Sequence, residues 1–403
     1  MHAAAPILGM IMSEGSSWAV LFGGPSPEHE ISILTGLQSE RVLTTSGESV
    51  LPIYWSPAGE WFQVPAGTEA KDYLEGVPAG SRPIEVRLSG EAGRSGGSGL
   101  YVKGRLGSRA IEVDAVLLCL HGGIGEGGGA AALFTFLGIP ATGSTVFAGA
   151  VAMDKLAFGG VMVAAGIPSL PREHLSATTA PSFPGPYIVK PRFGGSSIGI
   201  EIVDDADAAR AIAKASPHLR AGAVVEPYRP ELVDLNISFR TYPNLEVTAV
   251  ERPLRGSEST EVASGLYSYA EKYLSGDAGS EAGLSSAPRE FPAKIAPAVA
   301  AKAREFAIRT AEVTGLTGVV RVDLLLDEKT GDLFVNEVNS IPGAMSLYLW
   351  ALQVPAARVL TDALIEARDR RVVVPASGFG SGAALRLAGG IAGKLVGLDG
   401  PRG

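Results

Sequence analysis

The chain has 403 residues, of which 46% are hydrophobic and 19% are charged, a composition typical of a globular protein of two or three domains. The formal net charge of −8 excludes the overall basic field that proteins use to hold nucleic acid or an anionic membrane. The single cysteine, Cys119, excludes an internal disulfide and indicates a reducing, cytoplasmic location. No apolar run is long enough to span a membrane.

The first predicted domain covers residues 17–143. From Trp18 the sequence alternates short apolar runs, glycine-rich turns and helical stretches, which predicts an α/β domain with a parallel sheet. Residues 86–109 are rich in Gly, Ser and Arg and predict a surface excursion that contains a hairpin. Residues 113–120 are nearly all apolar, as in a strand buried on both faces, and end at the turn HGGIGEGGG.

Two further α+β domains and a tail follow. Residues 144–226 predict a helix at 146–165, a strand at 187–190, a helix at 206–216 and a strand at 223–226. Residues 227–375 predict two antiparallel strands between 237 and 253, a loop at 275–289, a helix at 293–314 capped by Gly315, and a final strand pair. Residues 376–403 have no strong periodicity and predict a tail.

The final strand pair carries the strongest constellation of polar residues, in RVDLLLDEKTGDLFVNEVNSIPG. A three-residue loop centred on Thr330 would place Asp323 opposite Glu337. It would also place Arg321 opposite Asn339, and because side chains repeat every two residues along a strand, all four would share one face. Two carboxylates and an amide oxygen suit Mg²⁺ that bridges the phosphates of a nucleotide. The alternative is an ordinary hairpin with a solvated polar face.

A second constellation supplies cations to this acidic protein. Lys190 ends a strand and is followed by the turn Gly194-Gly195-Ser196-Ser197, which can offer backbone amides to a phosphate. Lys155 lies upstream in the sequence MDK. Together the two lysines predict a triphosphate site.

A competing signature is Gly123-x-Gly125-x-x-Gly128, which follows a strand and matches a dinucleotide fingerprint. However, no acidic residue for a ribose follows at the expected distance. A nicotinamide-dependent oxidoreductase therefore remains as a further alternative.

Several motifs in order resemble one family. They are FGGPSPEHEIS (22–32), HGGIGE (121–126), GIPATG (138–143), MDK (153–155), IVKPRFGGSSIG (188–199), VVEPY (224–228), YSYAEKY (267–273), RVDLLLD (321–327) and NEVNSIPG (336–343). Over residues 19–349 the chain resembles D-alanine–D-alanine ligases and, more broadly, ATP-grasp ligases. The resemblance implies an ATP-grasp fold of three domains, with ATP between the central and C-terminal ones. It also implies an enzyme that joins two small amino acids through an acyl-phosphate, forming ADP and phosphate.

The resemblance assigns roles to individual residues. ATP would be bound by Lys155, Lys190, Glu226, Tyr228 and Asp234, and Mg²⁺, for which Mn²⁺ can substitute, by Asp323, Glu337 and Asn339. Catalytic roles would fall to Glu28, Ser196, Lys272, Tyr273, Arg321 and the amide of Gly343, and substrate binding to Glu28, His121, Tyr348 and Leu349. The family also implies a homodimer, with no nucleic-acid or membrane partner.

The sequence departs from the family mainly around its amino-acid pockets. Gly127 replaces the usual Asp after HGGIGE, and Gly194 replaces the Glu common before the two serines. Tyr348 stands where the family has a serine that holds the carboxylate of the second substrate, although Leu349 is kept. These departures favour a specialised dipeptide or antibiotic-pathway ligase for which D-alanine is a poor second substrate.

Three alternatives remain open beside that interpretation. The first is the housekeeping D-alanine–D-alanine ligase of peptidoglycan synthesis, and the second is a nucleotide-binding regulatory protein without ligase activity. The third is a shift of register after Gly343 that lets Ser346 take the role of the missing serine.

Overall fold

The computed structural model describes residues 17–88, 97–104, 107–254 and 288–370, together with 382, 385 and 386. The chain divides into two compact units, Met1–Arg371 and Val372–Gly403, and all elements below belong to the first. Nearly all of the predicted tail and most of the predicted loop 275–289 lie outside the described residues. In the described part of the chain, no helix is long and apolar enough to cross a membrane.

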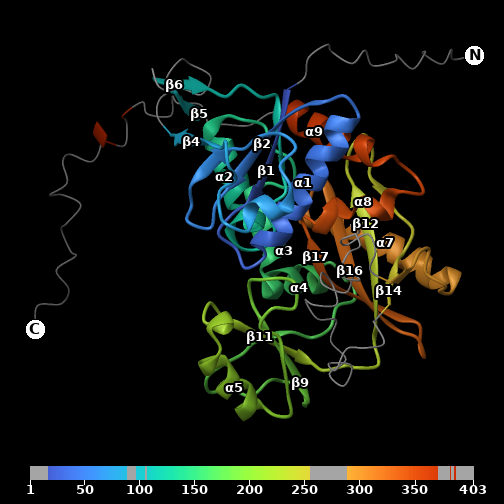
Figure 1. Ribbon diagram of the computed structural model, residues 1–403. Coiled ribbons are helices and arrows are strands. Elements are labelled where there is room, and N and C mark those ends of the chain that lie inside the picture. Colours follow the sequence, from blue (N-terminus) through green and yellow to red (C-terminus); the bar gives the residue numbers. More distant parts are fainter. Residues whose placement is uncertain are drawn as a thin grey trace, which may run out of the picture. The chain divides into compact units, whose positions relative to one another are not determined.

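The first part of the chain forms a mixed sheet in the order β6-β5-β4-β3-β2-β1-β7 (Figure 1). At one end of this sheet β1 (Ser17–Gly23) lies between β2 (Ser49–Trp55) and β7 (Ala115–Leu118) and is parallel to both, and α1 (His29–Thr45) connects β1 to β2. After Ser17 every residue of β1 is buried, as expected for a parallel strand covered on both faces. The predicted parallel sheet is confirmed here.

Antiparallel strands extend this sheet: β3 (Trp61–Gln63), β4 (Arg82–Arg87), β5 (Gly99–Gly104) and β6 (Gly107–Ala110), with the short helix η1 (Ala70–Tyr73) before β4. The hairpin predicted within residues 86–109 is present as β5–β6. The predicted excursion is wrong for the described residues, because β4 and this hairpin continue the main sheet. The turn after β7 leads into η2 (Gly125–Gly129) and α2 (Ala130–Leu137).

The predicted helix at 146–165 is two helices, α3 (Val146–Met153) and α4 (Lys155–Ala164). Asp154 separates them, because its side chain accepts hydrogen bonds from the Leu156 and Ala157 amides and so caps α4. This break makes Lys155 the first residue of α4.

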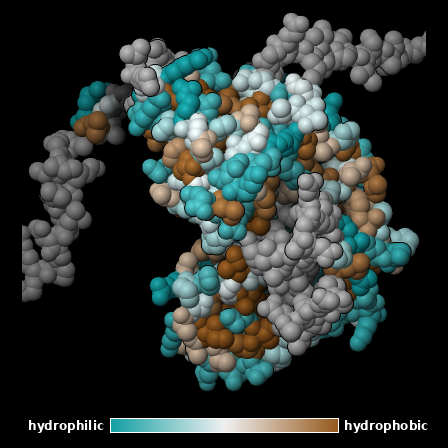
Figure 2. Space-filling model, in the orientation of Figure 1, coloured by the Kyte–Doolittle hydropathy of each residue, from teal (hydrophilic) through white to brown (hydrophobic). Residues whose placement is uncertain are grey.

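A small antiparallel sheet follows, in the order β10-β9-β11-β8. It consists of β8 (Glu173–His174), β9 (Tyr187–Pro191), β10 (Glu201–Val203) and β11 (Ala223–Pro227), with α5 (Ala206–Ala215) and η3 (Pro217–Leu219) beside it. Its core includes Val189, Ala209 and Val225. Figure 2 shows hydrophobic residues gathered on the visible face of the part that carries β9, β11 and α5.

The C-terminal sheet has the order β13-β12-β16-β17. Its strands are β12 (Val233–Arg240), β13 (Glu246–Val247), β16 (Val319–Asp327) and β17 (Asp332–Asn339), and α7 (Pro297–Thr314) packs on it and ends at Gly315, which has a φ of +66°. A separate ribbon pairs β14 (Arg252–Pro253) with β15 (Arg289–Glu290). The predicted hairpin and the glycine cap are both confirmed.

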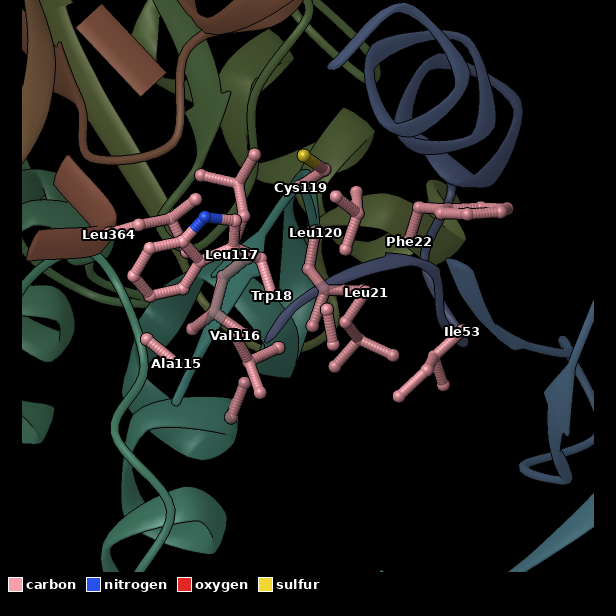
Figure 3. Packing of buried hydrophobic residues seen from close by; sticks show 14 of the residues in the cluster. Trp18, Leu21, Phe22, Ile53, Ala115, Val116, Leu117, Cys119, Leu120 and Leu364 are labelled. Atoms are coloured by element: carbon pink, nitrogen blue, oxygen red, sulfur yellow. The ribbon is translucent and has the colours of Figure 1, made fainter. Parts of the chain in front are cut away.

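The last described helices return to the N-terminal sheet. The turn η6 (Gly343–Ser346) leads into α8 (Leu347–Trp350) and then α9 (Ala356–Asp369). Leu360 and Leu364 of α9 are fully buried in the same core as Trp18 and Leu117, and Figure 3 shows Leu364 within this cluster. Residues far apart in the chain therefore complete one core, while the predicted bounds 17–143, 144–226 and 227–375 stay a prediction.

Candidate functional site

A cavity lies where the β9–β11 sheet faces the β12–β16–β17 sheet. Its lining includes, of the residues predicted from the sequence, Lys155, Lys190, Ser196, Glu226, Tyr228, Asp234, Arg321, Asp323, Glu337, Asn339 and Tyr348. Four others, Glu28, His121, Gly343 and Leu349, do not line it, and Leu349 is fully buried. Lys272 and Tyr273 lie outside the described residues.

The β16–β17 hairpin contains the predicted residue pairs, but a change of register in one strand is needed to form them. Asp323 is paired with Glu337 and Arg321 with Asn339, as predicted. The loop is different, because Asp327 pairs with Asp332 and the register shifts after Asp323. The extra residue is Asn336, so a β-bulge restores the predicted pairing, and both Asn336 and Glu337 line the cavity.

The carboxylates of this hairpin are balanced by cations. Asp323 receives the Arg321 guanidinium at 2.6 and 2.9 Å and the Asn339 side-chain amide at 3.0 Å. Glu337 lies 3.2 Å from Lys155 Nζ, which also donates to the Gly194 carbonyl at 2.5 Å. The repulsion between the two carboxylates in this cavity is therefore offset by two positively charged side chains.

The donor set also fits a hard divalent cation. Two carboxylates are available, and Asn339 uses its nitrogen for Asp323, which leaves the amide oxygen as its metal-binding atom. Oxygen ligands of this kind suit Mg²⁺ or Mn²⁺. Among the described residues no group of three or more His, Cys, Asp or Glu side chains could hold a metal. A cation at this pair of carboxylates would therefore need the amide oxygen of Asn339 and oxygens from a bound ligand as well.

A buried ion pair forms the opposite wall. Lys190 Nζ lies 2.7 Å from Glu226, and Arg172 Nε lies 3.4 Å from the same carboxylate. Burial alone would raise the pKa of Glu226, but the charges of Lys190 and Arg172 hold that pKa below its usual value. Arg172 also donates to the backbone carbonyls of Lys155 and Asn336. The sequence analysis missed Arg172, since nothing local distinguishes it from a surface arginine.

Glu28 reaches the cavity wall through Ser196, whose hydroxyl donates to its carboxylate. Glycines surround this carboxylate: a Cβ on Gly122 would lie 2.2 Å from Glu28 Oε2, and one on Gly195 would lie 3.2 Å away. Gly122 also has a φ of +65°. The contact between Glu28 and Ser196 thus requires glycine at position 122, whereas a Cβ at Gly195 would be tight but would need only a small shift of the carboxylate.

His121 and Glu126 fasten the loop that follows the hairpin. His121 Nε2 is 2.8 Å from Thr35 Oγ1, which accepts from the Ala344 amide. Burial lowers the pKa of His121 to about 4, against a hydrogen bond to the Ile341 backbone. Glu126 accepts from the Gly122 and Ile341 amides at 2.9 and 3.2 Å, and burial raises its pKa to about 7. In this structure His121 is a buried connecting residue, and its predicted substrate role stays a prediction.

The residue at the position of the family serine has its own partners. The Tyr348 hydroxyl lies 3.4 Å from Glu251, and the guanidinium carbon of Arg289 lies 4.1 Å from the centre of the Tyr348 ring. Ser346, in contrast, is fully buried and does not line the cavity. Its hydroxyl has no hydrogen-bond partner among the described residues. A role for Ser346 in substrate binding has no geometric support.

An antiparallel sheet carrying Lys190, with Lys155 at the start of α4, faces a second sheet that carries paired carboxylates and an arginine. This arrangement defines an ATP-grasp ligase. Comparisons with known proteins give the family. The model of the D-ala D-ala ligase N-terminus matches residues 17–144, and that of the C-terminus matches residues 165–367. The chain belongs to the D-alanine–D-alanine ligase family, and is an ATP-dependent ligase that forms ADP and phosphate.

Individual relatives agree with this assignment. A D-alanine–D-alanine ligase of Bifidobacterium animalis subsp. lactis is 30% identical over 387 residues, covering 86% of this chain and 97% of that protein. A D-alanine–D-alanine ligase from Methylobacterium sp. (strain 4-46) is 32% identical over 375 residues, covering 88% of this chain and 92% of that protein.

Two solved structures share the fold. The VanG D-Ala:D-Ser ligase from Enterococcus faecalis has a TM-score of 0.67 at 23% identity, covering 88% of this chain and all of that one. The D-alanine–D-alanine ligase from Coxiella burnetii has a TM-score of 0.68 at 21% identity, covering 89% and 95%.

Proposed function

We propose that this protein joins two molecules of D-alanine into D-alanyl-D-alanine at the expense of ATP, the housekeeping reaction of peptidoglycan synthesis. The observation that carries the proposal is the pairing of Asp323 with Glu337 on the cavity wall, beside Arg321 and Lys155. The relatives named above favour this activity over the specialised ligase that the sequence analysis preferred. The Bifidobacterium and Methylobacterium relatives are both named D-alanine–D-alanine ligases, whereas VanG, which is named a D-Ala:D-Ser ligase, is 23% identical and supports the fold alone.

ATP would lie between the two sheets. Lys155 and Lys190 supply positive charge for its phosphates, and Glu226, Tyr228 and Asp234 line the part of the cavity assigned to adenine and ribose. Apolar side chains beside them, including Ile188 and Leu170, suit the faces of a base. Asp323, Glu337 and Asn339 would hold Mg²⁺ or Mn²⁺, which neutralises charge on the phosphates during transfer.

The first D-alanine would present its ammonium to Glu28, whose carboxylate is oriented by Ser196. Its carboxylate would attack the terminal phosphate of ATP, giving an acyl-phosphate and ADP. Arg321 stands beside Asp323, so its guanidinium can stabilise the transferred phosphoryl group and the later tetrahedral intermediate. The amide of Gly343 is proposed as a second donor to that intermediate. The amine of the second D-alanine then displaces phosphate.

Assembly and location belong to the same proposal. A homodimer is what the family implies, and the lone Cys119 is buried and reduced, in keeping with a cytoplasmic enzyme. Lys272 and Tyr273 keep their predicted catalytic roles.

The test is a coupled ADP-release assay with D-alanine, L-alanine, D-serine and D-lactate, with the dipeptide identified by mass spectrometry. We expect ADP and D-alanyl-D-alanine in equal amounts with D-alanine alone. ATP turnover without dipeptide, or with another acceptor from this panel preferred at least tenfold, would contradict the proposal and restore the specialised ligase.

A further inference from the structure

A group of four polar residues lines the cavity without a role in the nucleotide or metal site. Glu251 is 3% exposed and accepts from the Asn236 side-chain amide at 3.0 Å. Its other oxygen lies 3.2 Å from Arg289, and the Tyr348 hydroxyl lies 3.4 Å from the carboxylate. All four residues line the cavity. We call Glu251, Arg289 and Tyr348, with Asn236, the acceptor cluster.

The acceptor cluster adjoins the face where phosphoryl transfer is proposed. Asn236 of β12 is paired with Asp323 of β16, so the two side chains are neighbours on one sheet face. The charges of Arg321 and Asp323 also act on the ionisation of both Glu251 and Tyr348. The cluster therefore lies beside the reacting groups, at the position where the sequence exchanges the family serine for Tyr348.

The positively charged side chains that line the cavity differ in their carboxylate partners. Lys155, Lys190 and Arg321 each form an ion pair with a carboxylate that we propose binds the metal or the nucleotide. Arg289 instead pairs with Glu251, and its guanidinium lies over the Tyr348 ring. A guanidinium that stacks on an aromatic ring and pairs with a neighbouring carboxylate is held in one orientation. A fixed guanidinium is the side chain best shaped to bind a carboxylate through two parallel hydrogen bonds.

We propose that Arg289 binds the carboxylate of the amine substrate, and that Tyr348 and Glu251 position its guanidinium. The inference rests on the proposed function, and it names how this chain recognises its second substrate. The replacement of the family serine by Tyr348 removes a hydroxyl that could donate to the substrate carboxylate. In exchange, the Tyr348 ring supports the Arg289 guanidinium, which donates to that carboxylate instead. D-alanine would remain an acceptor despite the missing serine.

The experiment compares an acceptor that has a carboxylate with one that lacks it. The enzyme receives ATP, Mg²⁺ and an equimolar mixture of D-alanine and D-alaninamide, and mass spectrometry measures the ratio of D-alanyl-D-alanine to D-alanyl-D-alaninamide. A ratio does not depend on the fraction of enzyme that is active. We expect the wild type to favour the free carboxylate at least tenfold, since a charged hydrogen bond is lost with the amide.

Three variants locate that preference. Arg289→Gln should lower the product ratio at least tenfold, and Arg289→Lys should retain part of the wild-type ratio. Glu251→Gln should lower the ratio less than Arg289→Gln does, and it should raise the KM for D-alanine as the second substrate. Arg252→Gln is the matched control, because Arg252 lies on the paired strand β14, contacts Glu328 at 2.9 Å and does not line the cavity. It should leave the ratio unchanged.

The outcomes separate this inference from the proposed function. A wild type that forms neither product overturns the proposed function, and the inference with it. A wild type that forms D-alanyl-D-alanine but accepts D-alaninamide equally well overturns the inference alone, even if no variant is soluble. An unchanged ratio in Arg289→Gln has the same consequence.

Discussion

Asp323 and Glu337 face each other from neighbouring strands, and each is held by its own cation. Changing Glu337→Gln or Asp323→Asn keeps the shape of the side chain but removes a metal-binding charge. We expect Mg²⁺-dependent turnover to fall about a hundredfold or more, with little change in the melting temperature, because like-charge repulsion is also relieved. ADP release measured over a range of Mg²⁺ concentrations checks this.

A matched control for these variants is Glu305→Gln on α7, because the Glu305 side chain is 60% exposed and forms an i,i+4 ion pair with Arg309. It should behave as wild type. Unchanged turnover at saturating Mg²⁺ in either cavity variant would remove the metal assignment.

Ser346 tests the register of the turn after the hairpin. It is fully buried at a φ of +50°, and its hydroxyl has no partner among the described residues. A buried hydroxyl without a hydrogen bond costs about 1–3 kcal/mol. Ser346→Ala should therefore keep full dipeptide synthesis and raise the free energy of unfolding in urea by about 1 kcal/mol. Loss of synthesis in this variant would instead revive the shifted register.

At the scale of elements, Arg172 ties together three parts of the cavity wall. It lies beside Glu226 of β11 and donates to the carbonyls of Lys155 in α4 and Asn336 in β17. Arg172→Met keeps the length of the side chain but leaves Glu226 with less compensation for its burial. We expect a loss of about 3 kcal/mol in the free energy of unfolding and a higher KM for ATP.

The control for this change is Arg210→Met on α5, where Arg210 pairs with the exposed Asp207 at 2.7 Å. Exposed pairs contribute about 0–1 kcal/mol. Denaturant unfolding of both variants decides the matter, and equal losses would show that Arg172 contributes no more to stability than an exposed ion pair does.

At the scale of the whole molecule, His121 and Glu126 link the N-terminal sheet to the loop after the C-terminal hairpin. Their pKa values are displaced in opposite senses. His121 has a pKa of about 4 instead of 6.5, so the unfolded chain binds the extra proton and stability falls as the pH drops below about 6.5. Glu126 has a pKa of about 7 instead of 4.5, so the folded chain binds the extra proton and stability falls as the pH rises towards 7.

The two effects oppose each other between about pH 4.5 and 6.5, and each amounts to about 3 kcal/mol. The reference is the double variant that carries both His121→Gln and Glu126→Gln. In His121→Gln alone, Glu126 still titrates, so the free energy of unfolding should decrease from pH 4.5 to 7 relative to that reference. In Glu126→Gln alone it should increase from pH 4 to 6.5 relative to the same reference. Urea unfolding at several pH values measures both slopes, and slopes of equal sign in the two single variants would contradict the assignment.

The sequence by itself determined much of this protein. The assumed loop centred on Thr330 predicted that Asp323 faces Glu337, and the two-residue repeat of a strand, which is a local property, predicted that these residues share a face with Arg321 and Asn339. The ordered motifs predicted the family, and the helix cap at Gly315 followed from the backbone freedom of glycine. The loop predicted for the hairpin was wrong, yet the predicted pairs form because the bulge at Asn336 compensates the longer loop.

Only the tertiary structure decided which other side chains line the cavity or support its wall. Arg172 meets Asn336 across 164 residues of sequence, and Tyr348 meets Glu251 across 97. The burial of α9 against Trp18 is equally long-range. Such contacts depend on how sheets and helices pack in space, and no local periodicity records that packing. The residue types needed for ATP chemistry can therefore be read in order along the chain, while the partners that balance their charges are brought to them by the fold.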